Sequence, residues 1–206
     1  MPYQLDLSLI SIQEYKEILK SQNLLPGRRM LWQDIDCRFE IIEKSGIVNL
    51  ALLRKALSTP VKIASFADAC GIPEQYLTLL KREMSSLEQK PVSIDNFPGM
   101  DSEVIIGLHD KGINNSKEYW ESRPPRDELI CLCDLVRING VGSVAAKAFY
   151  EAGYTSAADV SGANAQDMLA RVSEVNEEKH YYNAKVGVKD MQFCIDFASL
   201  LMRFSG

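Results

Sequence analysis

Two stretches of the chain share one residue pattern at a fixed offset of 41 positions, and this repeat constrains the fold more than any other feature. Each copy opens with a glycine-containing turn, continues as a helical stretch and closes on a second glycine. The alignment needs no gap and pairs Gly99 with Gly140, Ser102 with Ser143, Leu108 with Phe149 and Gly112 with Gly153. The repeat predicts two successive units in which a tight turn leads into a short helix, because glycine tolerates backbone angles that a Cβ would block.

The turn of the second copy reads Ile138-Asn139-Gly140-Val141-Gly142, and that of the first reads Phe97-Pro98-Gly99-Met100-Asp101. In the second copy an apolar residue, a glycine, an apolar residue and another glycine open a helix, which resembles the hairpin of the helix-hairpin-helix family. The resemblance implies that two short helices meet at the turn. It also implies that the turn grips nucleic-acid backbones without reading the base sequence.

A longer resemblance surrounds the second turn. The run CDLVRINGVG over residues 133–142, continued by YEAGY over 150–154, resembles a bacterial family of uncharacterised proteins, domain of unknown function 4332. The hallmark of that family is a D-L-x-R-I-x-G-V-G segment, and the resemblance is specific over residues 126–204 and fainter over 8–122. It implies a compact all-α array of helix-hairpin-helix-like units, similar to the helical bundle of SAM and helix-hairpin-helix domains. It implies no established activity.

Amphipathic spacing and cap residues predict helices along nearly the whole chain and no confident strand. Gln89-Lys90-Pro91 marks the expected boundary between an N-terminal helical domain (1–90) and a tandem helix-hairpin-helix domain (91–206). The first domain is expected to hold a degenerate hairpin unit from Gly27 to Gly46, whose glycines lie 19 positions apart against 13 in the other copies. The polar and aromatic stretch 176–187 is expected to be a loop, and 189–204 the last helix.

The charge distribution opposes nucleic-acid binding by the half of the chain that carries the hairpins. Residues 1–90 contain 12 Lys and Arg against 11 Asp and Glu, whereas residues 91–206 contain 11 against 17. Affinity for nucleic acid depends largely on neutralising phosphates, so an acidic domain starts at a disadvantage. With no apolar run of membrane-spanning length and no secretory signal, the 206-residue chain is expected to be cytoplasmic, with no membrane partner.

The second hairpin nevertheless offers the chemistry of a phosphate clamp. Backbone N–H groups at the start of a helix point outward, where the helix dipole also favours an anion. The candidate nucleic-acid-binding residues are Arg137, Gly140, Val141, Gly142, Ser143 and Lys147. The alternative is that the glycines only allow two helices to pack at a tight angle. In the first hairpin Asp101 replaces the second glycine, and its carboxylate would compete for the same N–H groups.

Two functions remain open from the sequence. The first is non-enzymatic, sequence-independent DNA binding through the hairpin clamp. The second is a protein-protein interaction or scaffold module that binds no nucleic acid. No catalytic, metal or cofactor motif is recognisable around the two histidines, His109 and His180, or the five cysteines. An enzyme, a metal site and a cofactor are therefore not expected, and the cysteines are expected to be buried thiols.

Overall fold

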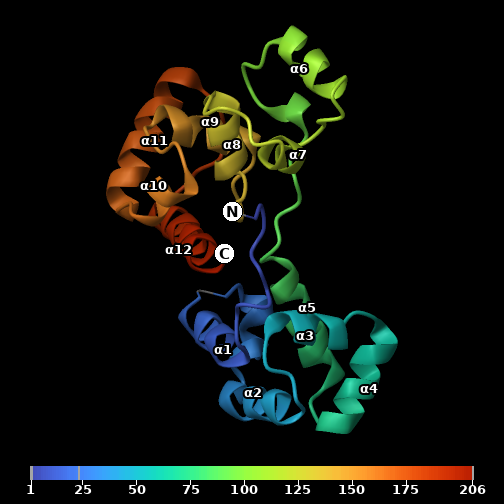
Figure 1. Cartoon of the computed structure of the whole chain (residues 1–206). Coiled ribbons are helices and arrows are strands. Elements are labelled where there is room, and N and C mark those ends of the chain that lie inside the picture. Colours follow the sequence, from blue (N-terminus) through green and yellow to red (C-terminus); the bar gives the residue numbers. More distant parts are fainter. Residues whose placement is uncertain (1, 23, 206) are drawn as a thin grey trace. The chain divides into compact units, whose positions relative to one another are not determined.

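The computed structural model describes residues 2–22 and 24–205, and over these residues the chain forms helices and no strand (Figure 1). The α-helices are α1 (Ile12–Ser21), α2 (Ile35–Lys44), α3 (Leu50–Ala56), α4 (Pro60–Cys70), α5 (Glu74–Ser85), α6 (Ser102–His109), α7 (Ser116–Glu121), α8 (Glu128–Leu135), α9 (Ser143–Glu151), α10 (Ala157–Ser161), α11 (Ala165–Lys179) and α12 (Val188–Phe204). Two 3₁₀ helices, η1 (Pro26–Trp32) and η2 (Ile94–Asn96), lie between them. The all-α expectation is confirmed.

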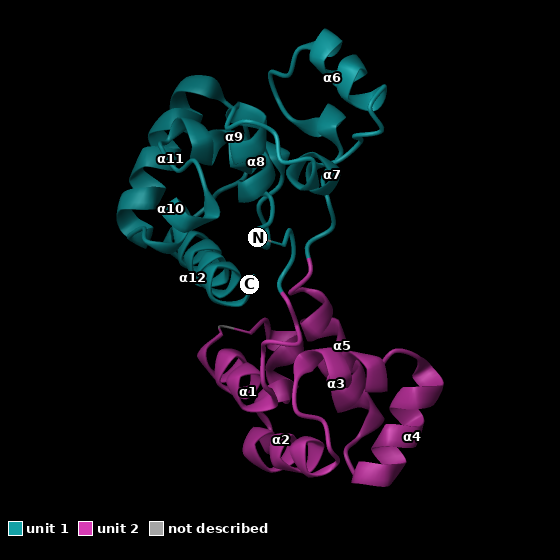
Figure 2. Cartoon of the chain, viewed as in Figure 1, with its two compact units in different colours: residues 1–5, 89–206 teal, residues 6–88 magenta. Residues whose placement is uncertain are grey.

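The chain divides into two compact units, shown in different colours in Figure 2. The inserted unit comprises residues 6–88, and the outer unit comprises residues 1–5 together with 89–206. The inserted unit ends between residues 88 and 89, two residues before the domain boundary that was expected between residues 90 and 91. The expected division also omitted the start of the chain, which joins the outer unit because Tyr3 bonds Ser116 and Arg137 there.

Local caps explain where the helices of the inserted unit begin. Ser11 and Glu14 form a capping box at α1, Asn49 caps α3, and Thr59 caps α4 just before its proline. The helices bury an apolar core that includes Leu19, Phe39, Leu50, Leu53, Tyr76, Leu77 and Leu80. The proposed degenerate hairpin is not formed at its first turn, because Gly27 lies within η1 and lacks the positive φ of the hairpin glycines.

The 41-residue repeat is visible in the outer unit as a turn, a helix, a second turn and a second helix. Gly99 and Gly140 both have positive φ, as do Gly112 and Gly153, and α6 and α9 begin 41 positions apart. The agreement extends beyond the expected pattern, since α7 and α10 also begin 41 positions apart. The copies differ before the first turn. Helix α8 precedes the turn of the second copy, whereas only the single turn η2 precedes that of the first.

The core of the outer unit joins the second copy to the C-terminal helices. Helices α10 and α11 pack on α12, and α9 packs on α8 and α11. The buried residues include Leu132, Ile138, Ala146, Ala148, Val160, Met168, Ala198 and Leu201. The turn between α8 and α9 is packed on this core through the buried side chains of Ile138 and Val141.

The expected loop over 176–187 is shorter in the structure. Helix α11 continues to Lys179 and ends at His180, whose φ of 55° is left-handed. The side-chain amide of Asn176 then folds the following chain back, donating to the carbonyl of Tyr182 and accepting from its N–H at 3.0 Å each. The expectation was wrong for residues 176–179.

Candidate nucleic-acid interface

The turn between α8 and α9 is anchored by its apolar residues and shaped by Gly140. Ile138 and Val141 are buried, and the Val141 N–H donates to the Ile138 carbonyl at 3.0 Å. Gly140 has a φ of 84°, a conformation that L-residues rarely adopt. A Cβ on Gly140 would also lie 3.6 Å from the ring of Phe193 on α12. The Val141 amide is therefore occupied within the turn and is removed from the set of proposed phosphate donors.

The first amides of α9 carry no internal partner. Gly142 occupies the N-cap position, which leaves no side chain to accept from the helix, and the first helical bond runs from Ala146 N–H to the Gly142 carbonyl at 2.9 Å. Within residues 2–22 and 24–205, no acceptor is found for the N–H groups of Gly142, Ser143 or Val144. These are the donors that an anion at a helix start requires.

Most other helix starts in the chain are capped by their own side chains. In the first copy of the repeat the Asp101 carboxylate accepts from the Glu103 N–H at 2.8 Å, as its sequence indicates. Gly142 shares the lack of a side-chain cap with Asp34 at α2, Pro73 at α5 and Gly187 at α12. An uncapped start is thus not unique to α9, but α9 combines it with an exposed glycine that leaves room for a ligand.

Lys147 lies one turn along α9 from Gly142, but its charge is already neutralised. Its ammonium contacts the carboxylates of Glu128 at 2.6 Å and Glu151 at 3.0 Å, and the side chain is 14% exposed. Burial lowers the pKa of Lys147, but the hydrogen bonds to the two carboxylates outweigh burial, so the pKa is raised. Lys147 remains protonated and serves first to hold α8 and α9 together.

Arg137 lies in the core and not on the surface of the hairpin, which corrects the expectation that it contacts a phosphate. The residue is 2% exposed. Its guanidinium donates to the carbonyl of Tyr3 at 2.8 Å, to Ser205 Oγ at 3.1 Å and to the carboxylate of Asp134. It also lies over the ring of Trp120, 4.7 Å from the centroid. With its donors used inside the protein, Arg137 has no free group to offer a ligand.

Lys189 is a cation near the hairpin that was not among the residues expected from the sequence. Lys189 is exposed on the first turn of α12, four residues before Phe193, whose ring contacts the turn at Gly140. Residues four apart on a helix lie on the same face, so Lys189 is on the hairpin side of α12. No ion pair of Lys189 is found in the described part of the chain. The i,i+4 spacing was readable in the sequence, but the contact of Phe193 with Gly140 was not.

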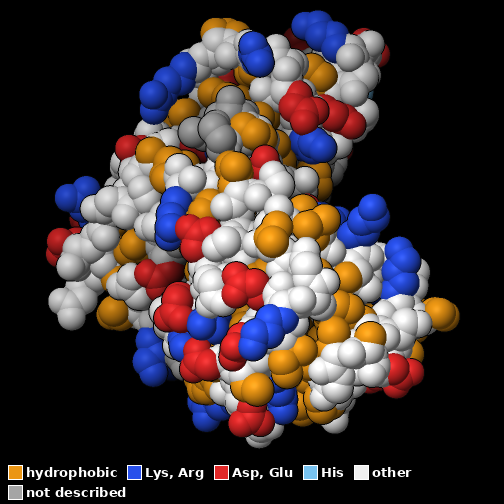
Figure 3. Space-filling view, turned by 60° about the horizontal axis from the view of Figure 1, so that its bottom comes forward, with side chains coloured by type: hydrophobic (Ala, Val, Ile, Leu, Met, Phe, Trp, Pro, Cys, Tyr) orange, Lys and Arg blue, Asp and Glu red, His pale blue; other side chains and the backbone are white. Residues whose placement is uncertain are grey.

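The charge of the surface is mixed. On the face of the molecule in Figure 3, basic and acidic side chains are interspersed, with hydrophobic side chains reaching the surface between them. Around Lys147 on α9, one cation meets the two carboxylates of Glu128 and Glu151. Any phosphate binding at α9 must therefore depend mainly on the helix start and only a few cations.

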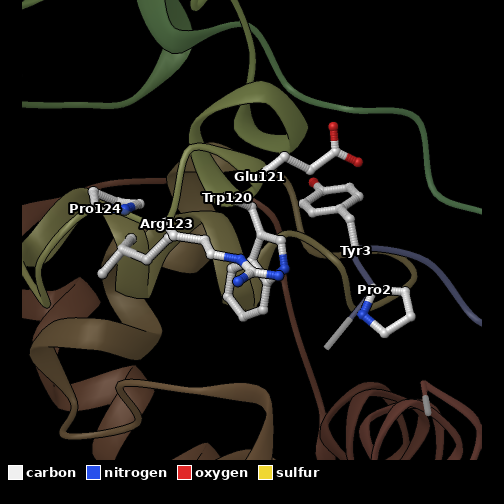
Figure 4. Close-up of a pocket in the computed structure, with 7 residues that line it drawn as sticks. Pro2, Tyr3, Trp120, Glu121, Arg123 and Pro124 are labelled. Carbon is white, nitrogen blue, oxygen red and sulfur yellow. The ribbon is translucent and has the colours of Figure 1, made fainter.

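A hollow of about 610 Å³ lies elsewhere in the outer unit, at the end of α7. Its walls include Tyr3, Trp120 and Arg123, and Figure 4 shows these side chains with Glu121 turned away from the Trp120 indole. Arg123 has a left-handed φ of 52°. The lining of the hollow contains one carboxylate, that of Glu121, and one guanidinium, that of Arg123, so the lining carries no net charge that would favour an anion.

The thiols and carboxylates do not form a metal centre among the residues that the structure describes, since no three potential ligands gather there. Three cysteines, Cys131, Cys133 and Cys194, are buried as expected. Cys37 is exposed and Cys70 is half-buried, so the expectation fails for these two. Burial raises the pKa of Cys194 to about 12, which leaves that thiol protonated and unreactive.

Comparison with known protein families gives a match over part of the outer unit. Residues 127–199 match a family described as "Domain of unknown function (DUF4332)". The matched segment runs from the N-cap of α8 into α12 and so contains the complete turn and the free amides of α9. No curated protein and no solved structure matches the chain. No helix of the described residues is long and apolar enough to span a bilayer.

Proposed function

We propose that the outer unit binds the sugar-phosphate backbone of DNA at the N-terminus of α9, without reading bases and without catalysing a reaction. The observation that carries this proposal is the set of unbonded N–H groups at Gly142, Ser143 and Val144. A phosphate oxygen accepts from such groups and is favoured by the helix dipole. Lys189 supplies a nearby positive charge in place of Arg137.

We also propose the structure and the location that the resemblance to the helix-hairpin-helix family and to the bacterial family implies. Helices α8 and α9 with their connecting turn act as a helix-hairpin-helix element, and the unit that begins at η2 is the incomplete first copy of this element. The protein acts in the bacterial cytoplasm, where DNA is accessible. A scaffold role without nucleic acid is the alternative, and it is favoured by the acidic balance of residues 91–206.

Direct titration of labelled DNA tests the proposal. Only one or two phosphates are engaged at α9, so the logarithm of the binding constant should fall with the logarithm of salt at a slope of about −1 to −2. Binding should be equal for unrelated sequences of the same length. An absence of binding at tens of micromolar protein and ~50 mM salt removes the proposal, because affinity due to phosphate contacts is greatest at low salt.

The substitution Gly142→Asp separates binding from folding. The first copy carries Asp101 at the equivalent position, where its carboxylate caps α6, and Gly142 has a φ of −85° that aspartate adopts without strain. A Cβ on Gly142 meets no atom within 4 Å. We expect the variant to keep or slightly raise the melting temperature, since aspartate caps helices at least as well as glycine, and to weaken DNA binding at least tenfold.

Two further substitutions change the charge away from the start of α9. The first tests the contribution of Lys189, and the second is a control for the added carboxylate. Lys189→Glu should weaken binding by a smaller factor and reduce the salt slope by about 1, because it removes one cation near the backbone. Asn183→Asp adds a charge in the exposed segment after α11 and should change neither value. Equal binding by wild type and Gly142→Asp would show that the α9 amides do not hold the phosphate.

A further inference from the structure

The inserted unit carries an apolar groove that the proposed DNA binding does not use. The groove has a volume of about 510 Å³ and lies between α3 and α4, with the turn after α2 at one end. It is lined by Gly46, Ile47, Leu52, Lys55, Ala56, Lys62, Ser65, Phe66 and Ala69. Leu52 remains 42% exposed there, and the neighbouring Val48 is 57% exposed.

Helix geometry makes the two walls continuous. On α3 the lining residues lie at positions 52, 55 and 56, and on α4 they lie at 62, 65, 66 and 69. These spacings of three and four residues place each set on one face of its helix. On the adjacent face of α4, Ile63 and Ala67 are buried in the core of the unit. The groove face of α4 can therefore pack against a further helix, because the inserted unit does not bury this face.

The charges around the groove have one sign. Lys55 stands on the α3 wall and Lys62 on the α4 wall, and the lining residues, all within the described chain, include no Asp or Glu. The Lys62 ammonium donates to the Ser58 hydroxyl at 3.1 Å. No ion pair of Lys55 or Lys62 is found among residues 2–22 and 24–205. A ligand with an apolar face and acidic edges would complement both the floor and the rim.

We propose that this groove docks an amphipathic α-helix of a partner protein, with apolar residues facing Leu52 and Phe66 and Asp or Glu residues facing Lys55 and Lys62. A third helix packs naturally into the furrow between two helices, with anchors at i, i+3 or i+4, and i+7. The α4 wall from Lys62 to Ala69 is about 10 Å long, which accommodates about two turns of the docked helix. The apolar anchors supply affinity, and the lysines select acidic partners and exclude basic ones.

Selection from a display library of amphipathic helical peptides, presented to the full chain, tests the groove. Each round is followed by removal of peptides that bind the Leu52→Asp variant, whose substitution places a carboxylate on the exposed groove floor. We expect the enriched peptides to share apolar residues at helical spacing flanked by Asp or Glu. Enrichment of basic or uncharged peptides, or no enrichment above the removal step, overturns the proposal.

The best enriched peptide is then measured by fluorescence anisotropy. Leu52→Asp should weaken its binding by about 10- to 100-fold, as expected for loss of one buried leucine contact. The pair Lys55→Glu and Lys62→Glu should weaken it on the order of tenfold at low salt, and less at high salt. Val61→Asp, on α4 but outside the groove and 76% exposed, and Lys44→Glu, on α2, should leave binding unchanged.

Sedimentation of the wild type and Leu52→Asp tests whether the groove receives a second copy of this chain instead of a partner helix. A concentration-dependent dimer that Leu52→Asp abolishes would mean that the groove receives a second copy of this chain, and the acidic-helix proposal would be wrong. Circular dichroism of each variant checks that the fold is retained. Loss of peptide binding in Val61→Asp as well as in Leu52→Asp would also overturn the assignment to this groove.

Discussion

The guanidinium of Arg137 donates hydrogen bonds to several polar groups in the core of the outer unit. It joins the carbonyl of Tyr3, the hydroxyl of Ser205 and the carboxylate of Asp134, whose other oxygen accepts from the Ala157 N–H at 2.9 Å. Asp134 and Arg137 are the two charged residues of the D-L-x-R-I run before the turn. Their burial together indicates that this part of the motif fixes the fold, whereas the glycines that follow shape the surface.

Replacement of Arg137 by alanine should destabilise the outer unit strongly. The variant leaves the buried Asp134 carboxylate without its cation, and loss of one partner of a buried pair costs about 3–5 kcal/mol. Urea denaturation followed by circular dichroism measures this loss. Lys185→Ala, in the exposed segment after α11, should change the free energy of unfolding by less than about 0.5 kcal/mol. A loss below about 1 kcal/mol for Arg137→Ala would contradict the structural role.

His109 provides a second residue-scale test, through its pH dependence. Asn114 Oδ1 lies 2.9 Å from Nδ1 and Asp95 Oδ1 lies 3.1 Å from Nε2, and these hydrogen bonds raise the pKa of His109 above its ordinary value of 6.5. Because the folded pKa is the higher one, the stabilisation is complete below pH 6.5 and is lost as the pH rises through the folded value. NMR titration should show a lower His109 pKa in Asp95→Asn; an unchanged pKa would exclude the contact with Asp95.

Elements with local signals were predictable, and those that depend on distant contacts were not. The capping box of α1 and the caps of α3 and α4 involve residues within three positions, so the sequence displays them. Pro91 explains the incomplete first copy: it stands 41 positions before Leu132, in the middle of α8, where proline prevents a helix. At the candidate site, the free α9 amides followed from the glycines, but the burial of Arg137 depends on residues 134 and 68 positions away.

Two glycines, Gly140 in the turn before α9 and Gly107 inside α6, should respond oppositely to alanine. Gly140→Ala forces a Cβ into a left-handed conformation beside Phe193, which costs about 1–2 kcal/mol. Gly107 lies inside α6 with no atom within 4 Å of a Cβ, so Gly107→Ala should stabilise by about 0.5–1 kcal/mol through helix propensity. Thermal unfolding of both variants measures the difference. A stabilising Gly140→Ala would show that the turn does not have the geometry described.

At the scale of the whole molecule, the chain begins in the outer unit, forms the inserted unit over residues 6–88 and then returns. The first residues are integral to the outer unit: the Tyr3 hydroxyl is 2.6 Å from Ser116 Oγ, and the Tyr3 ring packs edge-on near Trp120. Each unit has its own buried core and contains one of the two tryptophans, Trp32 in the inserted unit and Trp120 in the outer unit. Fluorescence can therefore follow the two units separately.

Removal of residues 2–4 should destabilise only the outer unit. The deletion takes away the Tyr3 ring and the carbonyl that accepts from Arg137, a loss of about 2–4 kcal/mol from one buried aromatic and one charged hydrogen bond. In a Trp32→Phe background the urea midpoint reported by Trp120 should fall, whereas in a Trp120→Phe background the midpoint reported by Trp32 should not move. Phe39→Ala, in the core of the inserted unit, should produce the reverse pattern. If both midpoints fall together in either variant, the units do not unfold independently, and the division of the chain at residues 5 and 88 has no thermodynamic meaning.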